Sequence, residues 1–253
     1  METKELVKLI ARQTLPHSAR RWFKAKWQNQ EYCPPVGAVR FGDLRRVKPI
    51  SQHFGFDRGQ PIDRYYIEKF LSNHAADIQG RVLEIADNTY TYQFGGDRVT
   101  KSDALYVFEG NPKATIVGDL TCANHIPSNT FDCIILTQTL PFIYDVRAAI
   151  KTLYRILKPS GVLLATMAGI SQISPSDMEM WGEYWRFTTL SSRKLFATVF
   201  PSTHFQVEAH GNVLTAISFL QGLAVDELRP EELDYCDPTY ELLITVRAVK
   251  PHE

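Results

Sequence analysis

The chain has 253 residues, of which 44% are hydrophobic and 22% are charged, proportions typical of a folded globular protein. No apolar run reaches the roughly 18 residues of a transmembrane helix, and the start of the chain, with Glu2, Lys4 and Glu5, does not resemble a secretory signal. We therefore expect a cytoplasmic protein. The four cysteines form no C-x-x-C pair and the histidines lack ligand spacing, so we expect no bound metal.

The net charge of zero conceals an uneven distribution of charge along the chain. Residues 1–50 contain 11 Lys and Arg against 4 acidic residues, a balance of +7, so the remaining residues carry −7. Within this basic part, residues 18–27 mix cations with aromatic side chains, which suits peripheral contact with an acidic membrane surface or a nucleic acid backbone. Alternatively, the segment is a solvated helix whose aromatic side chains pack on the acidic body.

The first predicted elements are a loop-rich extension and one helix. Residues 1–60 have the character of a basic N-terminal extension or cap, with breaks at Pro16 and at Cys33–Gly37, and residues 61–253 form the main domain. Apolar residues spaced by three and four predict a helix from Asp63 to about Asn73. Short strands are predicted at 81–86, 98–103, 114–118 and 131–136.

The remaining elements continue an alternation of helix and strand. A helix at 145–157 is expected to end at a turn, Lys158–Gly161, before a strand at 162–167. The C-terminal third adds helices at 191–199 and 212–223 and strands at 205–209 and 241–249. This order predicts an α/β fold with seven strands and a largely parallel sheet.

In open sheets of this kind, ligands bind beyond the carboxyl ends of the strands, so the loop Ala86–Tyr92 is the first candidate for a binding site. Val82–Ile85 is similar to the first strand of the class I S-adenosylmethionine-dependent methyltransferases, and Phe131–Leu140 followed by Leu157–Leu164 is similar to their fourth and fifth strands. The chain thus resembles this superfamily, and in particular its type-11 members, over about residues 62–170. The resemblance implies a doubly wound Rossmann-like sheet with the last strand antiparallel, and S-adenosylmethionine as cofactor.

The glycine-rich loop of the family is altered in this chain. Ala86, Asn88 and Tyr90 occupy the family's glycine positions. Glycine there allows positive φ and close approach of the ligand, so Ala and Tyr are expected to narrow the loop or force another path. A polar Asp87–Asn88 turn can still meet the amino-acid end of the cofactor.

The resemblance also implies roles for two further acidic residues. Asp103 is expected to end the second strand and to accept the ribose hydroxyls, and Asp119 to contact the adenine amino group. Alternatively, Asp103 caps the next segment and Asp119 is a turn residue. The expected cofactor site comprises Glu84, Ala86, Asp87, Asn88, Asp103, Asp119, Leu120, Thr137, Gln138 and Arg64.

Arg64 belongs to the polar and aromatic run Phe54–Tyr66, which precedes the first helix of the domain. Arg58, Arg64 and Tyr65 are candidates to contact the carboxylate of the cofactor. Alternatively, the acidic and basic residues of the run pair among themselves and fix the N-terminal segment; these are Asp57, Arg58, Asp63 and Arg64.

Catalytic candidates lie in the segment after the fifth predicted strand. Pro141–Phe142 stands where many family members have a His pair, so a general base must come from elsewhere. Residues 177–188 are rich in aromatic and charged side chains, and their last five residues, Tyr184–Thr188, are similar to a string in methyltransferases associated with glycan assembly. The candidate proton acceptors are Asp177, Glu179 and Tyr184, and the candidate acceptor-binding residues are Trp181, Trp185 and Arg186. Alternatively, Trp185 packs the loop and Arg186 forms a structural ion pair.

These observations predict O-methylation of a small polar acceptor, such as a saccharide or a glycosylated metabolite. The alternative is a non-catalytic, methyltransferase-like scaffold that binds partner proteins through its basic N-terminal segment, because a fold alone does not imply activity. Nucleic acid methylation is disfavoured, since the chain has no Asn-Pro-Pro-aromatic motif and no excess of basic residues beyond residue 50.

Overall fold

The computed structural model describes residues 33–252. The chain divides into two compact units, Met1–Val47 and Lys48–Glu253, and the described part of the first contains one short 3-10 helix, η1 (Gly42–Leu44). The basic segment 18–27 lies outside the described residues. In the second unit, the backbone amides of Ile50 and Ser51 donate hydrogen bonds of 2.9 and 3.1 Å to the Gln221 carbonyl, which joins residues 48–60 to the main domain.

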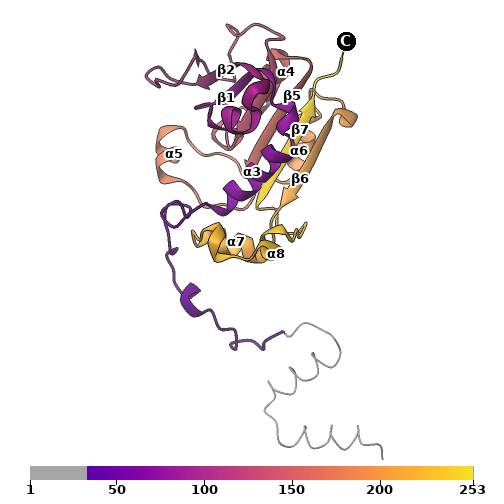
Figure 1. Ribbon diagram of the computed structural model, residues 1–253. Coiled ribbons are helices and arrows are strands. Elements are labelled where there is room, and N and C mark those ends of the chain that lie inside the picture. Colours follow the sequence, from indigo (N-terminus) through magenta and orange to yellow (C-terminus); the bar gives the residue numbers. More distant parts are fainter. Residues whose placement is uncertain (1–32, 253) are drawn as a thin grey trace, which may run out of the picture. The chain divides into compact units, whose positions relative to one another are not determined.

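The second unit is built on a seven-stranded sheet (Figure 1). The spatial order is β3-β2-β1-β4-β5-β7-β6, and β7 runs antiparallel to both β5 and β6. The predicted doubly wound α/β sheet with its last strand antiparallel is confirmed. The strands are β1 (Gly80–Ile85), β2 (Val99–Tyr106), β3 (Ile116–Val117), β4 (Phe131–Thr137), β5 (Leu157–Ala168), β6 (Phe205–His210) and β7 (Leu243–Val249).

Helices cover both faces of this sheet. Successive strand residues alternate between the faces, so Val82 packs in one apolar cluster with α3 and α7, and Leu83 packs in the other with α4 and α6. A largely parallel sheet needs such cover on both sides. The helices are α3 (Ile62–Asn73), α4 (Val146–Ile156), α5 (Pro175–Met180), α6 (Thr189–Phe196), α7 (Val213–Leu220) and α8 (Pro230–Asp234).

The sequence explains where the main helices begin. α3 follows Pro61, whose fixed φ suits a helix start, and the Asp145 carboxylate caps α4 by accepting the Ala148 amide at 3.0 Å. The Asn212 side chain accepts the amides of Leu214 and Thr215 at the start of α7. The long helices and strands therefore lie close to their predicted positions.

Two predicted strand boundaries are wrong. β2 continues past Asp103 to Tyr106, because the next two residues are buried and the strand pairs with β3 as far as Tyr106. β5 begins at Leu157, directly after α4, where we expected a turn. The irregularity lies inside the paired strands instead: the β4–β5 register shifts between Phe131 and Cys133, and Ser160 has a φ of 62°.

The connection from β1 to β2 contains only a short and irregular helix. Residues 89–90 are α-helical and lead directly into a π-helical turn, η3 (Thr91–Gly95), which is followed by a 3-10 turn, η4 (Gly96–Arg98). The connection is therefore short and lies close to the carboxyl end of β1, where the candidate site is found.

Candidate active site

A cavity of about 1260 Å³ opens at the carboxyl edge of the sheet. Its walls include the residues that follow four neighbouring strands: Ala86 after β1, Val107 after β2, Gly118 after β3 and Gln138 after β4. β1 and β4 are neighbours at the point where the strand order reverses, the usual ligand position in such sheets. Most of the remaining wall comes from residues 54–68, from residues 141–145 after β4 and from residues 171–184, which follow β5.

The loop after β1 keeps the backbone path of a glycine loop without its first glycine. Ala86 has a φ of 72°, in the left-handed region that glycine adopts without strain. For alanine this conformation costs about 1 kcal/mol. Tyr90 has a φ of −71°, and Asn88 is not among the described residues with positive φ. The altered residues thus have not forced the loop onto another path at Ala86, and Tyr90 stands in an ordinary helical conformation.

Glu84 holds this loop in place. Its carboxylate accepts hydrogen bonds from the Thr91 amide and hydroxyl, both at 2.8 Å, and from the Tyr90 amide at 3.2 Å. The side chain is 3% exposed, and this burial raises its pKa to about 7, although the hydrogen bonds from Thr91 and Tyr90 act in the opposite direction. Glu84 therefore lines the cavity, and its carboxylate holds the loop after β1 in place.

Asp103 lies away from the cavity wall. It is three residues short of the end of β2 and 3% exposed. Its carboxylate pairs with the Arg81 guanidinium at 2.6 Å and accepts a hydrogen bond from the Thr115 hydroxyl at 3.1 Å. The expectation that Asp103 ends the strand is wrong, and neither of its two proposed roles is supported by this position. Val107 and Phe108, which follow the true strand end, line the cavity instead.

The other expected cofactor residues mostly reach the cavity. Asp87 and Asp119 line it, with the Asp87 carboxylate bound to Lys113 at 3.0 Å and the Asp119 carboxylate accepting the Thr121 amide at 2.8 Å. Asn88 does not line it. The residues of the expected set that the structure brings together around the cavity are Glu84, Ala86, Asp87, Asp119, Leu120, Thr137, Gln138 and Arg64.

The run before α3 does not form the mutual ion pairs that we considered. Asp57 accepts a hydrogen bond from Ser51, and Arg58 pairs with Glu227. Arg64 lines the cavity with its guanidinium 5.9 Å from the centre of the Phe56 ring, and it forms no ion pair with another described residue. Arg64 is therefore free to bind an anionic group of a ligand.

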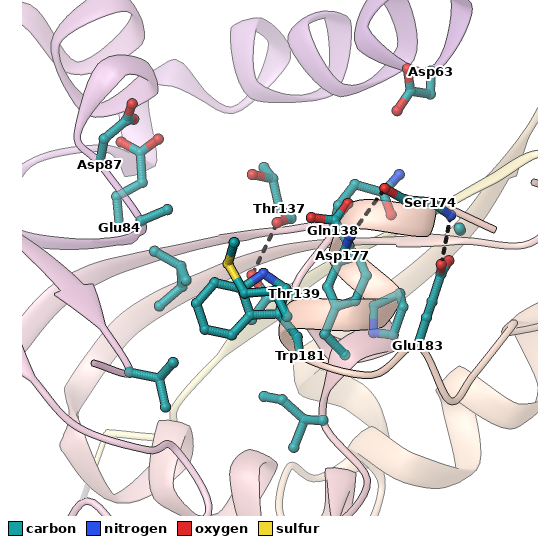
Figure 2. A pocket seen from close by; sticks show the side chains of 18 of the residues that line it. Asp63, Glu84, Asp87, Thr137, Gln138, Thr139, Ser174, Asp177, Trp181 and Glu183 are labelled. Atoms are coloured by element: carbon teal, nitrogen blue, oxygen red, sulfur yellow. Dashed lines mark hydrogen bonds between the residues drawn. The ribbon is translucent and has the colours of Figure 1, made fainter. Parts of the chain in front are cut away.

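The segment after β5 closes over the cavity towards β2. Ser174 caps α5, and at the far end of this helix the Trp181 ring stacks on Phe108 at 5.2 Å and meets Tyr106 edge-on at 5.4 Å. In Figure 2, Ser174 lies beside Asp177, whose backbone amide donates to the Ser174 hydroxyl, and Trp181 lines the same cavity. This segment is a lid that joins the β5 side of the cavity to the β2 side.

Only part of the expected catalytic and acceptor-binding set reaches the cavity: Asp177, Tyr184 and Trp181 line it, whereas Glu179, Trp185 and Arg186 do not. The Trp185 indole N–H donates to the carbonyls of Ile143 and Tyr144, at 3.1 and 3.2 Å. Arg186 pairs with Glu183 at 2.5 Å and donates to the Gln172 carbonyl at 2.7 Å. Trp185 and Arg186 thus follow the alternative interpretation, in which they pack and fix the lid.

Sequence analysis missed several cavity residues, of which Asp63 is the most informative. Asp63 is 9% exposed and lines the cavity from the first turn of α3. A signal was present: Asp63 shares the apolar side of this helix with Tyr66, Ile67 and Phe70, where a carboxylate is costly unless it has a function. Other missed polar residues include Glu68, Thr139, Asp145, Ser171, Ser174 and Glu183.

No helix within residues 33–252 is both long and apolar enough to span a membrane. The same residues contain no cluster of three or more His, Cys, Asp or Glu side chains arranged to hold a metal ion.

A family of known sequences matches the part of the chain that runs from β1 to β5. Residues 73–165 match the family described as methyltransferase domain. A stretch of 44 residues, 17% of this chain and 17% of the relative, is 46% identical to the ubiquinone/menaquinone biosynthesis C-methyltransferase UbiE of Haemophilus ducreyi. A second stretch of 89 residues, 35% of this chain, is 28% identical to probable polyketide synthase 10 of Dictyostelium discoideum. The chain spans 4% of that protein, and thus less than a fifth of either relative.

Solved structures with the same fold cover most of the second unit. A SAM-dependent methyltransferase from Archaeoglobus fulgidus aligns with 74% of this chain and 94% of its own, with a TM-score of 0.50 and 11% identity. A putative sarcosine dimethylglycine methyltransferase from Galdieria sulphuraria aligns with 74% and 86%, with a TM-score of 0.50 and 12% identity. At these identities the similarity concerns the fold.

Proposed function

We propose that this chain is a class I S-adenosylmethionine-dependent methyltransferase, because residues 73–165 match a methyltransferase domain and the fold is shared with methyltransferases of known structure. We further propose that it transfers a methyl group from S-adenosylmethionine to a hydroxyl oxygen of a small polar acceptor, such as a saccharide or a glycosylated metabolite. One observation carries the proposal. A single cavity joins the loops after β1, β2 and β3 to a polar region beyond β4 and β5, and so has room for a cofactor and an acceptor side by side.

The residues of the first region fit the cofactor. Ala86 keeps the left-handed conformation that brings the backbone close to a ligand, and Glu84 fixes the loop that follows. Arg64 would hold the carboxylate of the cofactor, because it lines the cavity and forms no ion pair with another described residue. Asp119 and Leu120 would hold the adenine at the end of β3.

The residues of the second region fit a hydroxylated acceptor. When bound, the cofactor supplies a methyl group on a positively charged sulfur, which is already a good leaving group. Gln138 and Thr139 after β4 and Ser171 after β5 present hydrogen-bonding groups that orient hydroxyls. Asp177 projects into the same space from α5, as Figure 2 shows, and accepts the proton of the attacking hydroxyl. Glu179, the other acidic candidate on α5, does not line the cavity.

A second candidate function is a protein-binding scaffold. One surface of α7 carries four exposed apolar side chains at 40–46% exposure: Val213, Leu214, Ile217 and Leu220. Such a stripe is typical of an interaction surface. This function does not require turnover, and it predicts tight association with a protein partner that substitution of Ile217 by a charged residue abolishes.

The first experiment is calorimetric titration of S-adenosylmethionine and S-adenosylhomocysteine into ligand-free protein. We expect micromolar binding that Asp119→Ala weakens by about tenfold or more, because a hydrogen bond to a charged group is lost. Glu179→Ala serves as the matched control, since Glu179 is acidic and exposed and does not line the cavity. Absence of binding to the unaltered protein would overturn the proposal in favour of the scaffold.

Methylation of a panel of hydroxylated acceptors then tests the assignment of Asp177. Asp177→Asn should lower kcat by about 100-fold while the affinity for S-adenosylhomocysteine is unchanged, because general-base catalysis contributes on this order. An unchanged kcat in this variant would show that Asp177 does not accept the proton.

A further inference from the structure

The cavity wall carries far more negative than positive charge. Its lining residues include eight Asp and Glu and one Arg, Arg64, with no Lys or His. The carboxyl groups belong to Asp63, Glu68, Glu84, Asp87, Asp119, Asp145, Asp177 and Glu183. A wall of this kind favours a ligand with positive charge, beyond the single sulfonium of the proposed cofactor.

Six of these carboxylates have partners within the described residues. Asp87 and Glu183 form ion pairs with Lys113 and Arg186, and Glu68 accepts a hydrogen bond from the Gln60 side chain at 2.9 Å. The other three accept backbone amides: Glu84 from Thr91, Asp119 from Thr121 and Asp145 from Ala148. These six carboxylates thus stabilise the loops and helices on which they lie.

Asp63 and Asp177 are the two carboxylates that remain. Asp63 is the more buried of them, at 9% exposed, and within the described residues it forms no ion pair and receives no hydrogen bond from another side chain. Burial raises the pKa of its carboxyl, and the Arg64 guanidinium and the backbone amides of Asp63 and Arg64 offset this only in part. Burying an ionised carboxylate costs free energy unless the carboxylate is paired with a cation.

The position of Asp63 points to the acceptor region. In Figure 2 its carboxylate points into the cavity from α3, on the side of Gln138, Ser174 and Asp177, whereas Glu84 and Asp87 lie on the opposite side. The side chain is therefore aimed at the space beyond β4 and β5, where the proposed acceptor binds.

We propose that the acceptor carries a protonated amine that binds to the Asp63 carboxylate, so that the substrate class is an amino sugar or a similar amino alcohol. This inference rests on the proposed function. The ammonium group keeps its proton and is the anchor, because a protonated nitrogen has no lone pair with which to attack. The hydroxyl oxygen forms the new C–O bond, the C–S bond breaks with its electron pair passing to sulfur, and the hydroxyl proton passes to Asp177.

The experiment compares three probes that differ only in the group at one carbon. Methyl glucosaminide, methyl N-acetylglucosaminide and methyl glucoside are titrated calorimetrically into the full chain, with and without saturating S-adenosylhomocysteine. We expect the charged amine to bind about tenfold or more tightly than either neutral probe, as a charge-assisted hydrogen bond requires. Equal binding of the three probes by the unaltered protein would overturn the proposal without any variant.

Two variants on α3 then locate the anchor. Asp63→Asn should remove the preference for the amine while changing the affinity for S-adenosylhomocysteine by less than about twofold, and its melting temperature should be equal to or above that of the unaltered protein, because a buried charge is lost. Glu68→Gln is the matched control: Glu68 lines the same cavity from the same helix but already has Gln60 as a partner. It should keep the preference.

Three outcomes contradict the assignment in different ways. A preference that survives Asp63→Asn places the anchor elsewhere. A loss of S-adenosylhomocysteine affinity as large as the loss of amine affinity would show that Asp63 binds the amino group of the cofactor. Failure of the unaltered protein to bind S-adenosylhomocysteine overturns the proposed function. In that case, the titrations of the three probes without S-adenosylhomocysteine still show whether Asp63 binds the charged amine in preference to the neutral probes.

Discussion

Two segments close the cavity from opposite sides, and they are held in different ways. The loop after β1 is fixed by one buried carboxylate, Glu84, which accepts hydrogen bonds mainly from backbone amides. The lid after β5 is fixed by pairs of side chains, Trp181 on Phe108 and Glu183 with Arg186. A segment held through its backbone tolerates changes of its own side chains, and this explains how the loop keeps its path with Ala86 and Tyr90 at glycine positions.

The largest effect should come from removing the carboxylate that holds the loop. Glu84→Ala leaves the amides of Tyr90 and Thr91 and the Thr91 hydroxyl without their acceptor, at about 1 kcal/mol for each lost hydrogen bond. We expect the free energy of unfolding to fall by about 3 kcal/mol and the affinity for S-adenosylhomocysteine to fall by about 100-fold. Denaturant melts and calorimetry measure the two. A loss of affinity below threefold would show that the loop is held by other contacts.

The pH dependence of stability should also reveal Glu84. Its pKa of about 7 in the folded protein lies above the 4.5 of the unfolded chain, so the folded state binds the proton more tightly. The stabilising contribution of this group is therefore present below pH 4.5 and is lost as the pH rises through 7. Relative to Glu84→Gln, the unaltered protein should lose about 2 kcal/mol between pH 5 and pH 8. Parallel stability curves for the two proteins would contradict the assignment.

The lid should respond to a smaller extent and through a different measurement. Trp181→Ala removes the stack on Phe108 and the edge contact with Tyr106, a loss of about 1 kcal/mol. We expect S-adenosylhomocysteine to dissociate about fivefold faster, because the lid opens more often. Glu179→Ala is the control, since Glu179 lies on the same helix, is exposed and does not line the cavity. Equal dissociation rates for both variants would show that the lid does not control release.

The same contrast explains how much of the molecule could be predicted from its sequence. The sheet was predictable because each buried strand and each helix carries its own apolar period, as in Val82–Ile85 and in the helix that Asp145 caps. The strand end at Asp103 was not, because the carboxylate within β2 is stabilised by Arg81 on the neighbouring strand. A partner 22 residues away leaves no local pattern.

The residues of the site fall into the same two groups, those whose position follows from the sequence pattern and those whose position depends on distant contacts. Glu84, Asp87 and Asp119 follow or end strands, and their place at the carboxyl edge follows from topology alone. The positions of the lid side chains depend on contacts between distant parts of the chain. The segment could therefore be predicted from the sequence, but not which of Trp181 and Trp185 faces the cavity. Asp63 was missed because its burial depends on how α3 packs, although its place on the apolar side of the helix was readable.

The smallest effect should come from restoring the missing glycine. Ala86→Gly relieves about 1 kcal/mol of strain at a φ of 72°, but glycine also gains entropy in the unfolded chain, so the net stabilisation should be about 0.5 kcal/mol. Ala86→Val, with a branched Cβ, should instead lower the melting temperature by several degrees, at about 2–4 °C per kcal/mol. Thermal melts compare the melting temperatures of the unaltered protein and the two variants. If valine is tolerated as well as alanine, the left-handed conformation at this position is wrong, and the loop has left the glycine path after all.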